Sequence, residues 1–304
     1  MYRLNYVVAV PVNENVASFI GKKGSENGLI FYNRKIDDKV IVALMPVNSE
    51  DKLFYGMAES MLIAGQIVIS TASVDKMLGE SIVAASLLDK HVIIIDETDV
   101  SGMVNGLFKD FEYCGMDSLL DRITSNKEQH DGSLRIDIDK AFPVKGIGTV
   151  ALGIVTRGIV RVHDQLHHWS GKTALVKSIQ SQDVDVSEAG YGTRVGLALK
   201  GIEYGELDKG DLMLATPYKK SREIEARLNV SPLSNEKLET NKRYVFISNF
   251  SRVECHIEEI AGNAKNESRI VFEKPLSIID GDAFMLIREK APRIFASGTV
   301  TKCL

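Results

Sequence analysis

Short apolar runs alternate with helix-like spacings over the first 131 residues of the chain. In two segments the apolar residues recur every three or four positions, which predicts helices over 53–62 and 75–88. Apolar runs of strand length lie at residues 6–10, 39–45, 66–71 and 91–96. Strands that alternate with helices pair in parallel, and strands covered on both faces are almost wholly apolar. The pattern therefore predicts an α/β domain with a parallel sheet.

The pattern changes across residues 124–134, a polar stretch with Asp-Gly near its end that is typical of a linker. Beyond this stretch, short runs rich in valine and isoleucine recur between glycine turns, as they do in antiparallel barrels. A second polar break lies at residues 216–222. We therefore predict one α/β domain followed by two β-barrels, with boundaries at 1–131, 132–217 and 218–304.

Composition and the cysteine spacing indicate the cellular compartment. No apolar run approaches the ~18 residues that a membrane-spanning helix needs. The N-terminus leads directly into an apparent strand and has no small-residue cleavage site of a signal peptide. Three cysteines, Cys114, Cys255 and Cys303, are scattered without zinc-binding spacing, which fits a reducing compartment. We expect a cytoplasmic protein without a membrane partner.

The charge is unevenly spread along the chain. Residues 1–131 carry 12 Lys and Arg against 19 Asp and Glu, whereas residues 132–304 carry 25 against 22. The net charge of −4 argues against a general DNA-binding protein. The positive balance of the second part indicates a different surface there.

One long segment carries a family resemblance. Residues 142–215 contain Gly-Ile-Gly-Thr-Val at 146–150, a glycine turn at Gly158 and Ala-Gly-Tyr-Gly-Thr-Arg-Val-Gly-Leu at 189–197. In this order they resemble the second domain of translational GTPases of the elongation factor Tu type. Residues 274–300 resemble the end of the third domain in the SelB-like branch, through Gly281, Asp282, Phe284 and the run 293–298. The whole chain resembles an archaeal SelB-like or EF-Tu-like protein.

The resemblance implies a P-loop-NTPase-like parallel sheet domain followed by two EF-Tu-type β-barrels. It also implies a phosphate-binding Gly-x-x-x-x-Gly-Lys-Ser/Thr loop after the first strand. Residues 11–18 stand there instead, as Pro-Val-Asn-Glu-Asn-Val-Ala-Ser, and Glu14 would repel phosphate. The second motif, Asp-x-x-Gly before a catalytic histidine, should follow the strand at 39–45. Leu44 and Asn48 occupy its key positions.

The guanine motif Asn-Lys-x-Asp should follow the strand at 91–96, where the chain has Asp96, Glu97, Thr98 and Asp99. By this comparison Asp99 retains the aspartate that faces the guanine edge, but a helix-capping or solvated-loop role is favoured. All three motifs differ from the family's in ways that weaken nucleotide binding. We therefore predict a pseudo-GTPase with no catalytic residue, no cofactor and no metal.

A cluster of histidines invites a metal interpretation. His163, His167 and His168 lie close to Asp164, yet the resemblance places them in a barrel strand and its turn, with polar residues facing water. The barrel interpretation is favoured, with Trp169 covering the barrel end. In the neighbouring glycine block, we predict that Gly196 lies in a strand where a side chain has no room.

The resemblance implies ribosome or tRNA as partner, because the family's second domain touches ribosomal RNA and the aminoacylated tRNA end. Binding without hydrolysis suits occupancy of dormant or inhibited ribosomes by a protein that is monomeric in solution. The candidate RNA contacts are Arg157, Arg161, Arg194, Lys219, Lys220 and Arg222. Two alternatives stay open: a GTP-binding SelB-like factor that delivers an aminoacyl-tRNA, and a protein-interaction module with no RNA ligand.

Overall fold

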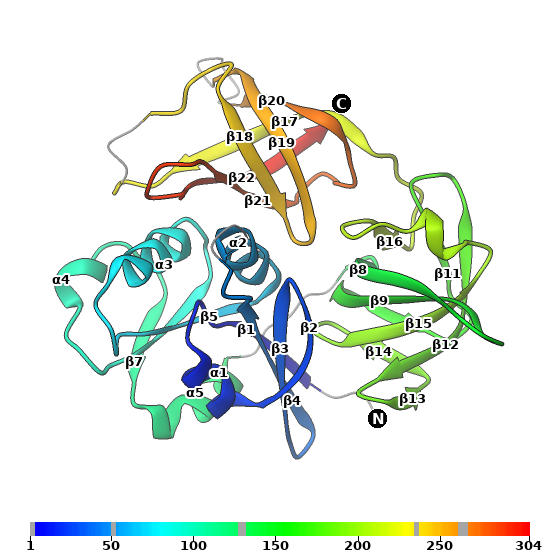
Figure 1. Ribbon diagram of the computed structural model, residues 1–304, viewed down its shortest axis with the longest axis horizontal. Coiled ribbons are helices and arrows are strands. Elements are labelled where there is room, and N and C mark those ends of the chain that lie inside the picture. Colours follow the sequence, from blue (N-terminus) through cyan, green and yellow to red (C-terminus); the bar gives the residue numbers. More distant parts are fainter. Residues whose placement is uncertain (1–3, 50–52, 127–131, 234–236, 261–266) are drawn as a thin grey trace.

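Three domains follow one another along the chain, and each lies against the other two (Figure 1). The computed structural model describes residues 4–49, 53–126, 132–233, 237–260 and 267–304. Along the chain, the α/β domain gives way to the first barrel between residues 125 and 135. The first barrel is followed by the second between residues 214 and 221. Part of the predicted linker, residues 127–131, lies outside the described residues.

The first domain is a seven-stranded sheet in the order β2-β3-β4-β1-β5-β6-β7. Its strands are β1 (Leu4–Ala9), β2 (Lys22–Asn27), β3 (Leu29–Ile36), β4 (Lys39–Pro46), β5 (Gln66–Ser70), β6 (His91–Ile95) and β7 (Phe111–Cys114). Its helices are α1 (Glu14–Ile20), α2 (Leu53–Ile63), α3 (Lys76–Ser86), α4 (Ser101–Val104) and α5 (Leu119–Ser125), with a 3-10 turn at η1 (Met116–Ser118). Helices α2 and α3 cover one face of the sheet, and α1 and α5 cover the other.

The predicted strands and helices are all present, and β4, β1, β5, β6 and β7 pair in parallel. Three strands of this sheet, β2, β3 and β7, were not predicted. β2 and β3 form an antiparallel hairpin that extends the sheet beyond β4, so the sheet is mixed at this edge. β2 is polar and almost fully exposed, and for this reason a search for apolar runs does not find it.

Two closed barrels make up the rest of the chain. The first barrel closes because β11 pairs with both β16 and β12. Its elements are β8 (Arg135–Val144), β9 (Gly148–Arg157), β10 (Ile159–Arg161), β11 (Gln165–His167), β12 (Thr173–Ser181), β13 (Val184–Val186), β14 (Glu188–Gly190), β15 (Arg194–Lys200), η2 (Tyr204–Glu206) and β16 (Leu212–Leu214). The second barrel consists of β17 (Ser221–Val230), β18 (Arg243–Ser248), β19 (Ser251–Glu259), β20 (Ser268–Leu276), β21 (Ala283–Ile287) and β22 (Ile294–Cys303). The predicted fold class is confirmed.

The expectation for Gly196 is wrong in one respect. Gly196 does lie in strand β15, but a Cβ placed on it would meet nothing nearer than Leu152 Cδ2, at 3.4 Å. A crowded strand glycine of this barrel is Gly153 in β9, where a Cβ would lie 2.6 Å from the backbone oxygen of Asp137. A backbone atom of a paired strand cannot move aside as a side-chain methyl can.

We predict that Gly153→Ala lowers the free energy of unfolding by ~1–3 kcal/mol, because its Cβ would overlap a backbone atom. Gly196→Ala, the matched control in the neighbouring strand, should cost clearly less, because its Cβ makes ordinary contacts. Urea denaturation of both variants measures the difference. Equal losses would show that the space around these two glycines is misjudged.

The first domain packs on the second barrel mainly through apolar side chains. Met57 of α2 belongs to the same buried cluster as Phe250 and Met285 of the second barrel. At the rim of this contact, the backbone N–H of Arg293 donates to the carboxylate of Glu80 in α3, 2.8 Å from Oε2. A shared apolar core of this kind resists separation of the domains.

The contact between the first domain and the first barrel is partly apolar, through Ile154 and Tyr191 of the barrel, and partly polar. Asn27 at the end of β2 donates to Asp139 Oδ1 (2.9 Å), and Arg194 donates to Asp139 Oδ2 (2.8 Å). Nearby, Lys209 Nζ donates to Glu59 Oε2 of α2 (2.9 Å). Burial raises the pKa of Glu59, and the positive charge of Lys209 opposes this rise. The buried carboxylates of Asp139 and Glu59 therefore each accept a hydrogen bond from the other domain.

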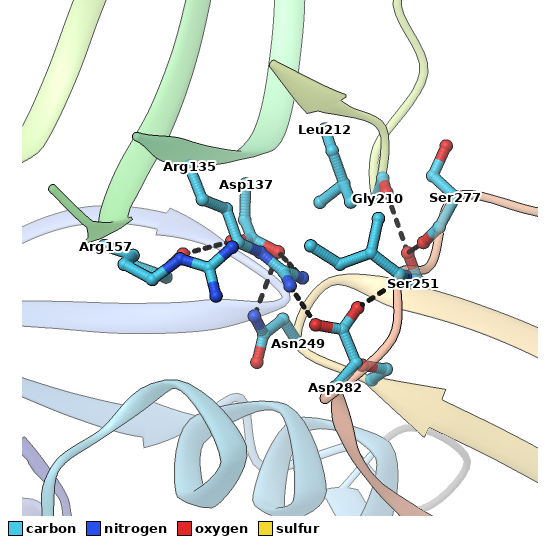
Figure 2. Close-up of polar contacts among 12 residues, drawn as sticks. Arg135, Asp137, Arg157, Gly210, Leu212, Asn249, Ser251, Ser277 and Asp282 are labelled. Atoms are coloured by element: carbon cyan, nitrogen blue, oxygen red, sulfur yellow. Dashed lines mark hydrogen bonds and ion pairs between the residues drawn. The ribbon is translucent and has the colours of Figure 1, made fainter. Parts of the chain in front are cut away.

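The two barrels meet at a buried ion network (Figure 2). Arg135 Nε and Nη2 each donate to the carboxylate of Asp137 over 2.9 Å, and Nη1 donates to Asp282 of the second barrel. Asn249 also donates to Asp137 across the interface (2.9 Å). The three charged side chains are at most 7% exposed. Because charges this deep are costly without partners, the network favours one relative position of the barrels.

The described helices are all too short to cross a lipid bilayer.

Candidate functional site

The loops after β1, β4 and β6 meet at one edge of the first domain, because these parallel strands end on the same side. This edge is where the resemblance would place a nucleotide. Residues 10–13 connect β1 to α1, and the side chain of Asn13 accepts a hydrogen bond from the backbone N–H of Val16 (3.0 Å). The helix start is thus capped by the chain itself. Pro11 has no N–H to offer, and Glu14 is exposed in the first turn.

At the end of β4, an apolar side chain occupies the position of the expected magnesium-binding aspartate. Leu44 is fully buried and belongs to the same cluster as Phe31 and Met57. Its backbone oxygen accepts a hydrogen bond from Val10 N (2.8 Å), which ties β4 to the start of the β1–α1 connection. Asn48 lies beyond the strand and is exposed. This position contributes packing to the domain core.

The acidic residues after β6 are used in local hydrogen bonds or are exposed. Glu97 Oε2 accepts a hydrogen bond from Ser70 Oγ (2.7 Å), and Asp96 is exposed. Asp99 Oδ1 accepts from the backbone N–H of Ser101, the first residue of α4 (2.9 Å). This bond lowers the pKa of Asp99 below its ordinary value. Asp99 thus lies just before Val100, the N-cap of α4, and its side chain is exposed.

The three histidines lie in different surroundings. His163 is exposed in a turn with φ of 77°, and His167 contacts the hydroxyl of Thr173 (3.3 Å). The expectation that polar side chains here face water is wrong for His168, which is 1% exposed and lies 3.3 Å from the buried carboxylate of Asp211. Among the described residues, no group of three His, Cys, Asp or Glu side chains is placed to hold a metal ion.

Two of the six basic candidates are bound within the protein. Besides its bond to Asp139, Arg194 lies over the ring of Phe31, with 3.7 Å from Cζ to the ring centroid. Lys220 Nζ lies 2.9 Å from Asp211 Oδ1 and 4.2 Å from the centre of the Trp169 ring. Trp169 is only partly buried and is covered by this lysine.

The other four candidates lie at or near the surface. Arg161 is exposed and pairs with Glu188 over 3.2 Å, a contact that contributes little in water. Lys219 and Arg222 are exposed in and just after the connection between the barrels. Arg157 is half-buried, and its Nε donates to the backbone oxygen of Ser133 (3.0 Å).

A cleft of about 540 Å³ between the barrels brings Arg157, Lys219 and Lys220 together. Its walls come from the end of β9, the connection 216–220 and the segment 278–280. The sequence analysis named these cations separately but did not place them in one cavity. The arrangement depends on how the barrels dock, and a sequence pattern does not contain that information.

No protein-family model matches the chain. Over 286 residues the chain is 32% identical to an uncharacterized protein of Methanocaldococcus jannaschii, and the match covers 90% of this chain and 92% of that protein. Over 88 residues it is 41% identical to the selenocysteine-specific elongation factor of the same organism, which covers 29% of this chain and 19% of that factor. Over 99 residues it is 29% identical to elongation factor 1-alpha of Metallosphaera sedula, covering 32% of this chain and 23% of the factor.

Solved structures extend the likeness to the whole chain. The elongation factor SelB of Methanococcus maripaludis, in complex with the GTP analogue GppNHp, has a TM-score of 0.79 and 18% identity, covering 100% of this chain and 80% of that one. The bacterial selenocysteine-specific factor EF-Sec has a TM-score of 0.77 and 17% identity, over 98% of this chain and 58% of that one. The chain belongs to one family with the uncharacterized M. jannaschii protein, and it is SelB/EF-Tu-like in part of its sequence and in its whole fold. These likenesses confirm the SelB/EF-Tu-like resemblance predicted from the sequence.

Proposed function

We propose that the protein acts as an elongation-factor-like component of translation that binds the ribosome or a tRNA without binding or hydrolysing GTP. The observation that carries the proposal is the fully buried Leu44 at the end of β4, where a nucleotide-binding relative needs a magnesium-linked carboxylate. The capped start of α1 and the exposed Glu14 support it, because the N–H of Val16 is already bonded and Glu14 brings negative charge toward a phosphate. The cytoplasm, which contains the ribosomes, is the compartment this function requires.

The same geometry supports a single domain arrangement. In nucleotide-driven switches, γ-phosphate contacts order loops that relax after hydrolysis. Here the segment between α1 and β3 is the strand β2, paired with β3 and bonded to the first barrel through Asn27. All three domain interfaces contain buried contacts, including Lys209–Glu59 and Arg135–Asp282. A protein of this kind occupies a site and leaves it by dissociation, which suits an inhibitory or dormancy role.

We expect the purified protein to co-sediment with ribosomes, or to shift tRNA in a gel, at low salt. Phosphate contacts make such binding weaken steeply as salt rises. Arg161→Glu/Arg222→Glu should weaken association and flatten its salt dependence, since both side chains are exposed on the barrels. The control Lys177→Glu/Lys200→Glu makes the same charge change at other exposed positions and should leave binding nearly unchanged.

Failure of the wild type to bind ribosomes and tRNA at low salt would exclude this function. The chain would then fit the protein-interaction module that the sequence left open. Micromolar binding of GTP would instead support a GTP-dependent elongation factor.

A further inference from the structure

The cleft between the barrels has the size and rigidity of a binding site. Its volume of about 540 Å³ falls within the range of ~300–1,000 Å³ that is common for ligand pockets. Both barrels build its walls, and the buried bond from Arg135 to Asp282 fixes the barrels to each other nearby (Figure 2). The cleft is therefore formed before any ligand arrives, and binding does not have to pay for ordering it.

Two cations in this cleft have unused hydrogen-bonding groups. The Nε of Arg157 is held by Ser133 O at 3.0 Å, and its stem packs on Gly132, where an added Cβ would lie 3.0 Å from Cδ. Within the described residues, the terminal nitrogens of Arg157 and the ammonium of Lys219 have no partner. A guanidinium fixed at Nε presents its remaining N–H groups in the geometry that phosphate oxygens accept in pairs. Lys220 is occupied by Asp211 and only lines the wall.

The rest of the lining selects against a simple polyanion. It contains the accessible apolar side chains of Pro217 and Ile279, and also the carboxylate of Asp280, which accepts a hydrogen bond from Cys303 N (2.7 Å). A ligand with negative charge on all sides would meet Asp280 unfavourably. A fitting ligand has a phosphate for the cations, a flat and partly apolar body for the apolar side chains, and hydroxyl or amino donors for the carboxylate. A ribonucleotide has this combination.

We propose that this cleft binds one nucleotide of a single-stranded RNA segment, with the phosphate at Arg157 and Lys219 and the base against Pro217 and Ile279. This assignment rests on the proposed function, because it takes RNA as the partner, and it adds the place of contact and the strandedness of the RNA. The cleft lies in the part of the chain that has the positive charge balance, 25 Lys and Arg against 22 Asp and Glu over residues 132–304.

The test uses the full chain and a fluorescein-labelled, single-stranded oligoribonucleotide of mixed sequence, with anisotropy as the readout. Arg157→Glu/Lys219→Glu should weaken binding about tenfold or more, since charge-assisted contacts are lost. The slope of log K against log salt should flatten by about 0.7 for each lost phosphate contact. Lys177→Glu/Lys200→Glu, with the same net charge but outside the cleft, should bind as the wild type does. Melting temperatures of both variants identify any loss of folding.

Equal binding by the wild type and Arg157→Glu/Lys219→Glu would overturn the assignment, as would equal weakening by the control variant. Adenosine monophosphate serves as a competitor. If it displaces the oligonucleotide at concentrations equal to those of unlabelled RNA, the ligand is a free nucleotide and the RNA assignment fails. If the wild type sediments with ribosomes while the cleft variant binds oligonucleotide normally, only the cleft assignment fails. If the wild type binds neither ribosomes nor tRNA, the proposed function fails as well.

Discussion

Calorimetric titration of the purified protein with GTP or GDP is expected to give no binding heat at micromolar concentrations. A phosphoryl-transfer site works almost entirely by positioning and by neutralising charge. At the edge of the sheet, the N–H of Val16 is occupied by Asn13, and Pro11 has no N–H to donate. Leu44 offers no oxygen to a magnesium ion, and Glu97 supplies negative charge where a lysine would support the guanine. Each of these positions removes part of the affinity, and together they leave no basis for a site.

A SelB protein that binds GppNHp, such as that of Methanococcus maripaludis, is the positive control under the same buffer and magnesium concentration. A dissociation constant below ~10 μM, about −7 kcal/mol, would contradict the prediction. Such a result would require a nucleotide pose that uses none of the three family motifs. It would also favour the alternative function, a GTP-binding SelB-like factor that delivers an aminoacyl-tRNA.

A chain can lose nucleotide binding and keep its barrels, because the two properties respond differently to substitutions. Nucleotide affinity depends on a few hydrogen-bond donors and one metal ligand. A single change at such a position, like those that placed Glu14 and Leu44 in this chain, can therefore abolish it. Barrel packing depends on many apolar contacts that tolerate gradual change. The closely matched segments of the elongation factors are therefore expected in the barrels, and the two local matches cover 29% and 32% of this chain.

Much of the fold could be predicted from the sequence, because periodicity reports burial directly. The strands at residues 66–71 and 91–96 and the helix beginning after Asp75 follow from their apolar spacing. Strand β2 did not follow, because an exposed edge strand has no apolar pattern. Its partner β3 has buried residues only in its first half.

The candidate site was predictable only in part. Asp99 at a helix start follows from the local preference of acidic side chains for that position. The burial of His168 against Asp211 and of Arg194 against Asp139 does not follow, since each pair joins segments more than forty residues apart. A basic residue in a sequence indicates a charge, and only the docking of the domains decides whether that charge faces a carboxylate or the solvent. For this reason Lys219 stays a candidate for RNA while Lys220 is occupied.

Removal of the charge at Arg135 should have the largest effect on stability. Burial alone would raise the pKa of Asp137, but the charge of Arg135 and the hydrogen bonds from Arg135, Thr156 and Asn249 outweigh it, so this pKa is lowered. Burial raises the pKa of Asp282, against the attraction of Arg135. Arg135→Met leaves both carboxylates buried without a cation. We expect a loss of ~3–5 kcal/mol in the free energy of unfolding at neutral pH, because an uncompensated buried charge is costly.

The pH dependence of Arg135→Met separates this cause from simple loss of packing. Without Arg135, burial raises the folded-state pKa of Asp137 and Asp282 above the unfolded value of about 4. The folded state then binds more protons than the unfolded state, so the variant should gain stability relative to the wild type as pH falls from 7 toward 5. In the wild type, the lowered pKa of Asp137 contributes stability above the unfolded pKa, and this is lost only as pH falls through the folded value. Urea denaturation at both pH values measures the difference, and Arg135→Met/Asp137→Asn/Asp282→Asn should recover much of the loss at pH 7. A deficit that is equal at both pH values and persists in the triple variant would mean that Arg135 stabilises the barrel contact through its packing and not through its charge.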